Sequence, residues 1–155
     1  MKTKNRKKII CICSFLVNLG IMNTVMADDI FCPDDIVCTT PSDMSSCYCR
    51  INKVKTNDWV VTTDGDEGAY ISRGAYNFHN AAVMLQGSKA TQTACVYTYF
   101  TADNSEARLA CKANASNLMP VLNDSSVWQL IYDTSLRYFC GNYNQKVDKS
   151  LCPLK

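Results

Sequence analysis

The sequence predicts a mainly β protein, in which a single compact antiparallel β domain, sandwich-like or partly rolled, carries disulfides and follows an N-terminal signal peptide. Three observations favour this fold class. β-Branched and aromatic residues recur in short runs between polar turns, eight cysteines remain after the leader, and no internal repeat or low-complexity linker divides the chain. Residues 28–155 are therefore expected to form one disulfide-stapled domain.

Residues 1–27 have the three parts of a secretory signal peptide. Five basic residues precede an apolar stretch from Ile9 to Leu19, and a small-residue cleavage site ends at Ala27. The apolar stretch is interrupted at Asn18 and is shorter than the ~20 residues that span a bilayer. We expect cleavage after Ala27, no membrane span in the mature chain, and a secreted or periplasmic location.

Removal of the signal peptide changes the net charge. The full chain has 16 Lys and Arg against 14 Asp and Glu, and the first 27 residues hold five of the basic residues and no acidic one. The mature chain thus has 11 basic and 14 acidic residues, a net charge of −3. No cluster of Lys and Arg remains that is typical of a nucleic-acid surface, so nucleic acid is not an expected partner.

An even number of cysteines in an exported chain predicts up to four disulfides. The candidates are Cys32, Cys38, Cys47, Cys49, Cys95, Cys111, Cys140 and Cys152. Zinc is the competing use of cysteine, but no Cys-x-x-Cys spacing occurs and His79 is the single histidine, so no metal site is expected. On a strand, Cys47 and Cys49 would share a face, and each needs a partner elsewhere.

The first half of the mature chain favours strands and turns. β-Branched and aromatic residues in Tyr48–Val54 and Trp59–Thr63 are typical of strands. The acidic stretch Asp64–Gly68 is interpreted as a turn, because Asp-Gly is a strong turn signal. A calcium loop is not expected, since the EF-hand pattern needs an oxygen ligand where Gly68 stands and a glutamate where Ala75 stands.

The alternation of aromatic and small residues from Thr93 to Phe100 predicts a strand, and a hairpin joins it to the segment that ends at Cys111. A loop over residues 101–105 sets three pairs opposite one another: Cys95 and Cys111, Tyr97 and Leu109, and Tyr99 and Ala107. This face is apolar and can be buried. The opposition of Cys95 and Cys111 also permits a disulfide between them.

Two segments stay open between strand and helix. Asn77–Leu85 is an apolar run whose length suits a buried strand or a short helix. Residues 105–113 contain good helix formers behind Ser105, an N-cap residue, so a helix competes there with the second strand of the hairpin. Residues 113–126 are expected to form a loop, followed by two closing strands over Val127–Tyr132 and Leu136–Cys140.

No catalytic or cofactor-binding residues are identified. A cysteine or serine nucleophile needs a histidine as base, and His79 is the single candidate in the sequence. Carboxylates for glycoside hydrolysis could come from five turn residues, Asp64, Asp66, Glu67, Asp103 and Asp133. Aromatic side chains are the alternative signal, since exposed aromatics form binding surfaces. The candidates for such a surface are Trp59, Tyr70, Tyr99 and Trp128.

The sequence therefore favours a non-enzymatic module that binds an unidentified protein or envelope component and needs no cofactor. The alternative function is a small secreted hydrolase that uses the turn carboxylates.

Several short motifs are spread over most of the mature chain. They are Cys32-Pro33, Trp59, Phe78 followed by Ala81 or Ala82, Cys95-x-Tyr97, Leu109, Trp128, Tyr138-x-Cys140 and Cys152-Pro153. With these motifs the chain resembles a family of small exported bacterial proteins known only as a domain of unknown function. The resemblance implies a bacterial source with a periplasmic or secreted location, and it supplies no catalytic residue.

The same resemblance divides the eight cysteines into two groups of four. Four match the family pattern: Cys32, Cys95, Cys140 and Cys152. The resemblance implies that Cys140 pairs with Cys152 and Cys32 with Cys95. Cys111 would then bond one of the three cysteines of the N-terminal part, Cys38, Cys47 or Cys49. This pairing is the alternative to a cross-strand bond between Cys95 and Cys111.

Mass spectrometry of the exported protein tests the signal peptide and the oxidation state together. We expect the intact mass of residues 28–155 less eight hydrogen atoms, because cleavage follows Ala27 and all eight cysteines are oxidised in this compartment. Alkylation without reduction should add no label. Labelling at several mature cysteines would contradict the disulfide framework and would reopen metal or redox chemistry.

Overall fold

A computed structural model describes residues 28–63, 74–100, 106–132, 135–141 and 146–155, and it is mainly β. The strands are β1 (Asp35–Cys38), β2 (Cys47–Ile51), β3 (Val54–Lys55), β4 (Trp59–Thr63), β5 (Gly74–Gln86), β6 (Lys89–Phe100), β7 (Glu106–Ala113), β8 (Trp128–Tyr132) and β9 (Leu136–Cys140). Two short 3₁₀ turns, η1 (Met44–Ser46) and η2 (Lys149–Leu151), complete the described elements.

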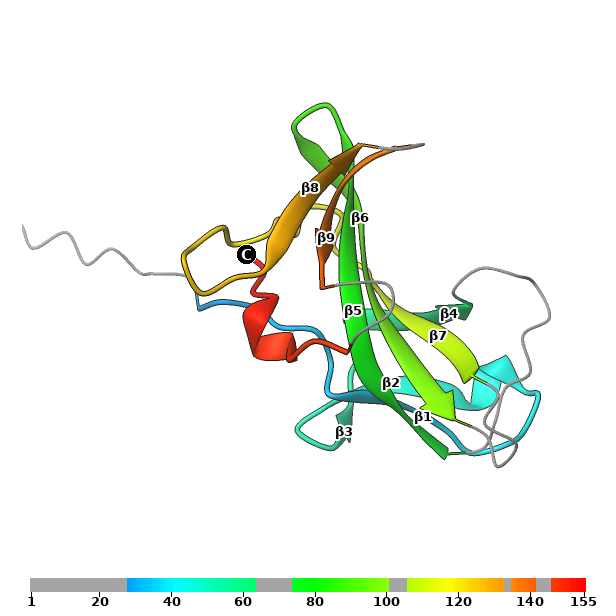
Figure 1. The fold of residues 1–155 in the computed structure, drawn as a ribbon. Coiled ribbons are helices and arrows are strands. Elements are labelled where there is room, and N and C mark those ends of the chain that lie inside the picture. The colour runs from blue at the N-terminus through cyan, green and yellow to red at the C-terminus, as the bar shows by residue number, and fades with distance from the viewer. Residues whose placement is uncertain (1–27, 64–73, 101–105, 133–134, 142–145) are drawn as a thin grey trace, which may run out of the picture.

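All nine strands belong to one antiparallel sheet built around the two longest strands (Figure 1). The main strand order is β3-β2-β1-β5-β6-β7-β4. One edge of β5 pairs with β6 along most of its length, whereas the other edge pairs first with β1 and then with β9, which carries β8. The predicted antiparallel β domain is confirmed, as a single open sheet that is rolled rather than as two separate layers.

The roll brings the two ends of the sheet together around the core. Strands β2 and β7 are separated by three strands in the sheet order, yet Cys49 of β2 is bonded to Cys111 of β7. Tyr97 of β6 and Leu109 of β7 belong to this core, and both are almost fully buried. Burial raises the pKa of the Tyr97 hydroxyl well above its ordinary value of 10.0, so the group stays protonated and donates to the Pro33 carbonyl at 2.7 Å.

The hairpin of β6 and β7 has the predicted register. Cys95 lies opposite Cys111, Tyr97 opposite Leu109, and Tyr99 opposite Ala107. Residues 106–113 form a strand, so the helical alternative is wrong. Burial of their apolar side chains against β6 contributes more free energy than helix propensity would. Asn77–Leu85 is likewise strand, within β5. The closing strands β8 and β9 also lie where the sequence places them.

The run Tyr48–Val54 is two strands rather than one. Asn52 and Lys53 have φ of 52° and 66°, and this pair of left-handed residues turns the chain back, so that Val54 pairs with Ile51. Two consecutive left-handed residues are the mark of a tight hairpin turn. The sequence did not indicate this turn, because it contains no glycine.

The eight cysteines of the mature chain form four disulfides: Cys32–Cys95, Cys38–Cys47, Cys49–Cys111 and Cys140–Cys152. The pairs implied by the family resemblance are present, and the cross-strand bond between Cys95 and Cys111 is wrong. Although these two cysteines are opposite each other, both point into the roll, where Cys32 and Cys49 approach them from other segments. Cys47 and Cys49 each have a separate partner, as their spacing predicts.

The two terminal segments lie side by side across one end of the roll. Ile30 and Leu154 exchange backbone hydrogen bonds at 2.7 and 2.8 Å, and Pro120 forms a second bridge to Leu154. The Trp128 indole donates to the Pro153 carbonyl at 3.0 Å. Together with Cys32–Cys95 and Cys140–Cys152, these contacts fix both terminal segments to the sheet.

The predicted signal peptide and the acidic turn Asp64–Gly68 lie outside the described residues. Within the described part of the chain, no helix is long and apolar enough to cross a membrane.

Replacing both cysteines of one disulfide by alanine, one disulfide at a time, should rank the contributions of the disulfides to stability. Cys49 and Cys111 are 62 residues apart and Cys38 and Cys47 only 9. The chain-entropy relation then gives losses of about 4 kcal/mol for Cys49→Ala/Cys111→Ala and about 2.5 kcal/mol for Cys38→Ala/Cys47→Ala. Urea unfolding monitored by tryptophan fluorescence measures both. An equal or reversed order would show that the long-range bond does not constrain the unfolded chain as expected.

Acid should weaken the contact between the two terminal segments. The Lys149 ammonium hydrogen-bonds to Asp34 and lowers the pKa of that carboxyl, opposed by partial burial and helped by the Asn52 N–H. A carboxyl whose pKa is lower in the folded than in the unfolded chain stabilises the fold at any pH above the unfolded value of about 3.9. This stabilisation is lost as the pH falls through the folded pKa. Asp34→Asn should therefore lower the urea midpoint at pH 7 and change it little at pH 2.5.

The effect of Asp34→Asn is expected to be small, because both partners of the ion pair are about one-third exposed. Asp124→Asn, at an exposed loop position, is the matched control and should leave the midpoint unchanged at both pH values. A deficit of Asp34→Asn that persists undiminished at pH 2.5 would contradict the electrostatic origin of the effect.

Candidate functional site

A β-bulge in β5 decides which side chains reach the outer face of the sheet. Phe78 pairs with Tyr97 and Asn80 pairs with Val96, so His79 is an extra residue in β5. Before the bulge the even-numbered residues Tyr76 and Phe78 face the core; after it the odd-numbered Ala81 and Val83 do. The bulge therefore turns Asn80 outward, where regular alternation would have placed it in the core.

The outward positions after the bulge carry small side chains at the centre of the sheet. Ala82 of β5 lies between Ala94 of β6 and Phe139 of β9 in the register. Longer side chains stand on either side along the strands, with Met84 towards one end and Val96 towards the other. A row of small residues between larger ones leaves a depression in the sheet surface.

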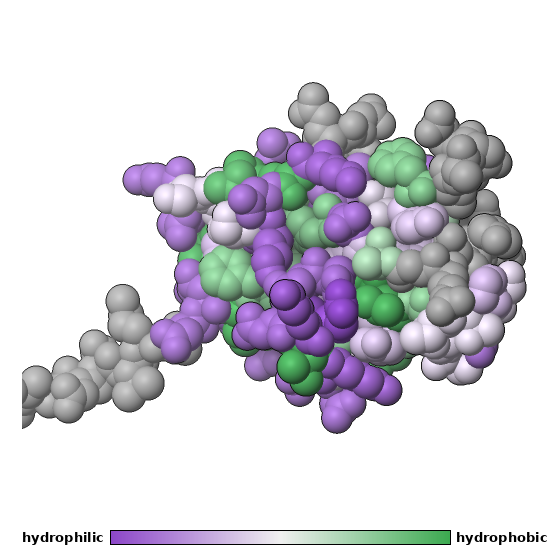
Figure 2. All heavy atoms as spheres, turned by 90° about the horizontal axis from the view of Figure 1, so that it is seen from below, coloured by the Kyte–Doolittle hydropathy of each residue, from purple (hydrophilic) through white to green (hydrophobic). Residues whose placement is uncertain are grey.

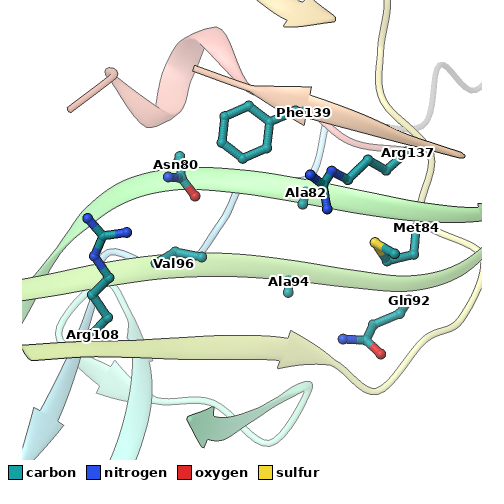
Figure 3. A pocket seen from close by; sticks show the side chains of 9 residues that line it. All are labelled: Asn80, Ala82, Met84, Gln92, Ala94, Val96, Arg108, Arg137 and Phe139. Atoms are coloured by element: carbon teal, nitrogen blue, oxygen red, sulfur yellow. The ribbon is translucent and has the colours of Figure 1, made fainter. Parts of the chain in front are cut away.

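This depression is a hollow of about 230 Å³, which we call the outer-face hollow (Figure 3). It is lined by Asn80, Ala82, Met84, Gln92, Ala94, Val96, Arg108, Arg137 and Phe139. The residues come from the four neighbouring strands β5, β6, β7 and β9. The hollow is thus built on strands that are hydrogen-bonded to one another.

Two guanidinium groups line the hollow. In Figure 3 Arg108 of β7 stands at one end, and Arg137 of β9 extends along the opposite part beside Ala82. Arg108 also forms an ion pair with Glu106, with 3.0 Å between Nη2 and Oε2, which fixes its orientation. None of the nine lining residues is acidic. The lining thus offers guanidinium donors and contains no acidic side chain of its own.

Asn80 supplies a buried acceptor at the wall of the hollow. It is 3% exposed, and its Oδ1 accepts no hydrogen bond from the described residues. In Figure 3 this oxygen lies on the side that faces Val96 and Ala82. Because a buried polar atom without a partner costs about 1–3 kcal/mol, such atoms mark sites where a ligand group or an ordered water completes the bonding.

Three of the four aromatic residues predicted from the sequence lie in the described part of the chain, and these three are buried or partly buried. Trp59 and Trp128 are 5% and 8% exposed and belong to the core, and Tyr99 is partly buried against Tyr76 with 5.4 Å between ring centroids. Alternation along the strands places them on the core face. Tyr70 lies outside the described residues.

The apolar residues that the structure exposes occur singly or as pairs of neighbours. Figure 2 shows hydrophobic residues in separate small groups on a largely hydrophilic face. Tyr132 at 82% and Leu130 at 57% exposure lie on β8. Small groups of exposed apolar residues are normal on a protein surface.

Of the residues considered for catalysis, His79 lies in the described part of the chain, and it does not line the hollow. His79 is buried at the bulge, where its carbonyl accepts from the Val147 N–H at 3.1 Å. The five turn carboxylates proposed for hydrolysis, Asp64, Asp66, Glu67, Asp103 and Asp133, lie outside the described residues. Among the residues that the structure describes, no group of three or more His, Cys, Asp or Glu could hold a metal ion.

Sequence reasoning did not identify the residues of the outer-face hollow. Arg108 alternates with Ala107 and Leu109, so the predicted hairpin already placed it on the face opposite the core. Asn80 and Arg137 could not be assigned to that face, because the bulge and the pairing of β5 with β9 leave no signal in the local pattern. The pair of small outward residues Ala82 and Ala94 was the available clue.

No family model, curated protein or solved structure matches this chain, so the geometry of the hollow must carry any functional conclusion.

Proposed function

We propose that this chain is an exported, non-enzymatic binding module of a bacterium, which takes an anionic group of a protein or envelope component in its outer-face hollow. The signal peptide is removed after Ala27, and the mature domain acts in the periplasm or outside the cell. Four disulfides and the lack of a membrane-spanning helix in the described residues are consistent with an oxidising compartment.

The observation that carries the proposal is the combination of two arginines with an apolar floor. Guanidinium groups bind carboxylates through paired N–H donors, and they do so more strongly where neighbouring apolar groups exclude water. Ala82 and Ala94 provide the recess, and Phe139, 5% exposed, forms an apolar wall. A few polar groups over an apolar surface are typical of ligand sites.

The hollow suits binding better than catalysis. Acid–base chemistry needs a group that exchanges a proton near neutral pH, and the lining residues hold no His, Cys, Asp, Glu, Lys or Tyr. Arginine stays protonated in proteins. The lining can therefore hold a charged ligand but cannot transfer a proton to it.

Ala94→Leu tests the proposed function, because it fills the floor of the hollow and removes no charge. Ala75→Leu is the matched control, an identical change at an exposed position of β5 outside the hollow. The immobilised mature protein and both variants are exposed to a solubilised envelope fraction, and the retained components are quantified by mass spectrometry. Wild type and Ala75→Leu should retain the same component, and Ala94→Leu should lose it by roughly tenfold or more.

Equal retention by Ala94→Leu, with circular dichroism unchanged, would rule out the hollow as the binding site. Failure of the wild-type protein to retain any component would count against a binding role altogether.

A further inference from the structure

We infer that the disulfide between Cys38 and Cys47 is an exchange site, at which the folded chain accepts two electrons from a dithiol whose thiolate approaches Cys47 through a hollow beside it. The site does not depend on the proposed function. A thiolate exchanges with a disulfide by direct attack on one of the two sulfurs, so access decides which disulfide of a folded protein reacts.

Cys47 is the disulfide-bonded cysteine that an external thiolate can reach. The other seven cysteines of the four disulfides are all buried, with an exposed fraction of 2% or less, whereas Cys47 is partly exposed. Reduction of the three disulfides that are buried at both ends therefore requires local opening of the sheet. The bond from Cys38 to Cys47 has one end that is accessible in the closed fold.

A hollow of about 220 Å³ lies against Cys47, and we call it the seam hollow. It lies between β2 and β4, which are not neighbours in the order of the described strands. Its volume is several times the roughly 30 Å³ of one water molecule, which is enough for a cysteine side chain. The lining residues are Cys47, Tyr48, Lys55, Thr56, Asn57, Trp59, Val60 and Val61.

The seam hollow suits an anionic sulfur. None of its eight lining residues is acidic, so an entering thiolate meets no like charge in the lining, and Lys55 is the one charged residue there. The seam hollow shares no lining residue with the outer-face hollow. The exchange site is therefore separate from the proposed binding site.

The exchange proceeds through a mixed disulfide. The attacking thiolate bonds to Cys47 Sγ, the bond between the two protein sulfurs breaks, and its electron pair leaves with Cys38 Sγ, which takes up a proton. The second thiolate of the dithiol then attacks its own sulfur in the mixed disulfide and releases Cys47, which is protonated in turn. The dithiol becomes a disulfide, and the chain gains two electrons and two protons.

The contacts around this disulfide remain when it is reduced. Cys38 and Cys47 lie opposite each other in the pairing of β1 with β2, where Arg50 Nε donates to Asp35 Oδ1 at 2.7 Å. The disulfide from β2 to β7 also stays in place. The bond closes the shortest separation of the four, 9 residues against 12, 62 and 63. The two thiols thus stay close together, and the oxidised dithiol can re-form the bond.

Limiting dithiothreitol tests the site in the mature protein without denaturant. Free thiols are trapped at intervals with N-ethylmaleimide and located by peptide mass spectrometry. Cys38 and Cys47 should be labelled roughly tenfold faster than any other cysteine, because the buried disulfides react only after local opening. Label that appears first, or at the same rate, at another pair would overturn the inference.

Val60→Trp tests the approach through the seam hollow. Val60 is exposed and lines the hollow, so a larger side chain there should obstruct Cys47 and slow its labelling by roughly fivefold or more. Val54→Trp is the matched control, an identical change at an exposed valine of β3 outside the lining, and it should leave the rate unchanged. Equal rates for Val60→Trp and wild type, with unchanged circular dichroism, would contradict this route.

Two further variants, which lack the same disulfide, show which sulfur is attacked. Cys38→Ala leaves Cys47 as a thiol, and Cys47→Ala leaves Cys38 as a thiol. The thiol of Cys38→Ala should react with oxidised glutathione roughly tenfold faster than the thiol of Cys47→Ala, because Cys38 is buried. Equal rates or the reverse order would refute the assignment of Cys47 as the attacked sulfur.

Reduced thioredoxin, at the same concentration as dithiothreitol, separates two sources of the dithiol. Faster labelling of Cys38 and Cys47 with thioredoxin assigns the site to a protein dithiol, and equal or slower labelling assigns it to a small one.

Discussion

The register of β5 against β6, set by the extra residue of β5 at His79, is the constraint on which the rest of the structure depends. Without the bulge, a regular β5 that places Tyr76 and Phe78 in the core would point Ala81 and Val83 outward and Asn80 inward. The bulge lets one long strand contribute to the core along its whole length. The same shift turns Asn80 to the outer face, so core packing and the candidate site share a single cause.

The disulfides stabilise a rolled sheet that its hydrogen bonds leave open in the described residues. Cys49–Cys111 spans the interior between β2 and β7, and Cys32–Cys95 joins the N-terminal segment to β6. Tyr97 lies among these bonds and donates to Pro33 beside Cys32. Because cross-links hold the interior, the outer surface of the central strands is free to carry small residues and arginines that contribute little to core packing.

Much of the fold followed from local patterns, whereas the candidate site did not. The alternation of side chains along residues 93–111 predicted the hairpin register. The polar turn residues around them predicted where β8 and β9 lie. The partner of Cys95 could not be derived from the hairpin, since the roll that brings Cys32 near is a tertiary feature. Asn80, Arg108 and Arg137 are far apart in sequence and become neighbours only through the bulge and the pairing of β9 with β5.

The orientation of Asn80 tests this account most directly, because both the bulge and the hollow require it to face outward. Nuclear Overhauser contacts of the Asn80 side-chain amide in the mature protein measure that orientation in solution. The account predicts contacts to the Val96 methyl groups on the outer face. Contacts to Tyr97 or Leu109 in the interior would contradict it.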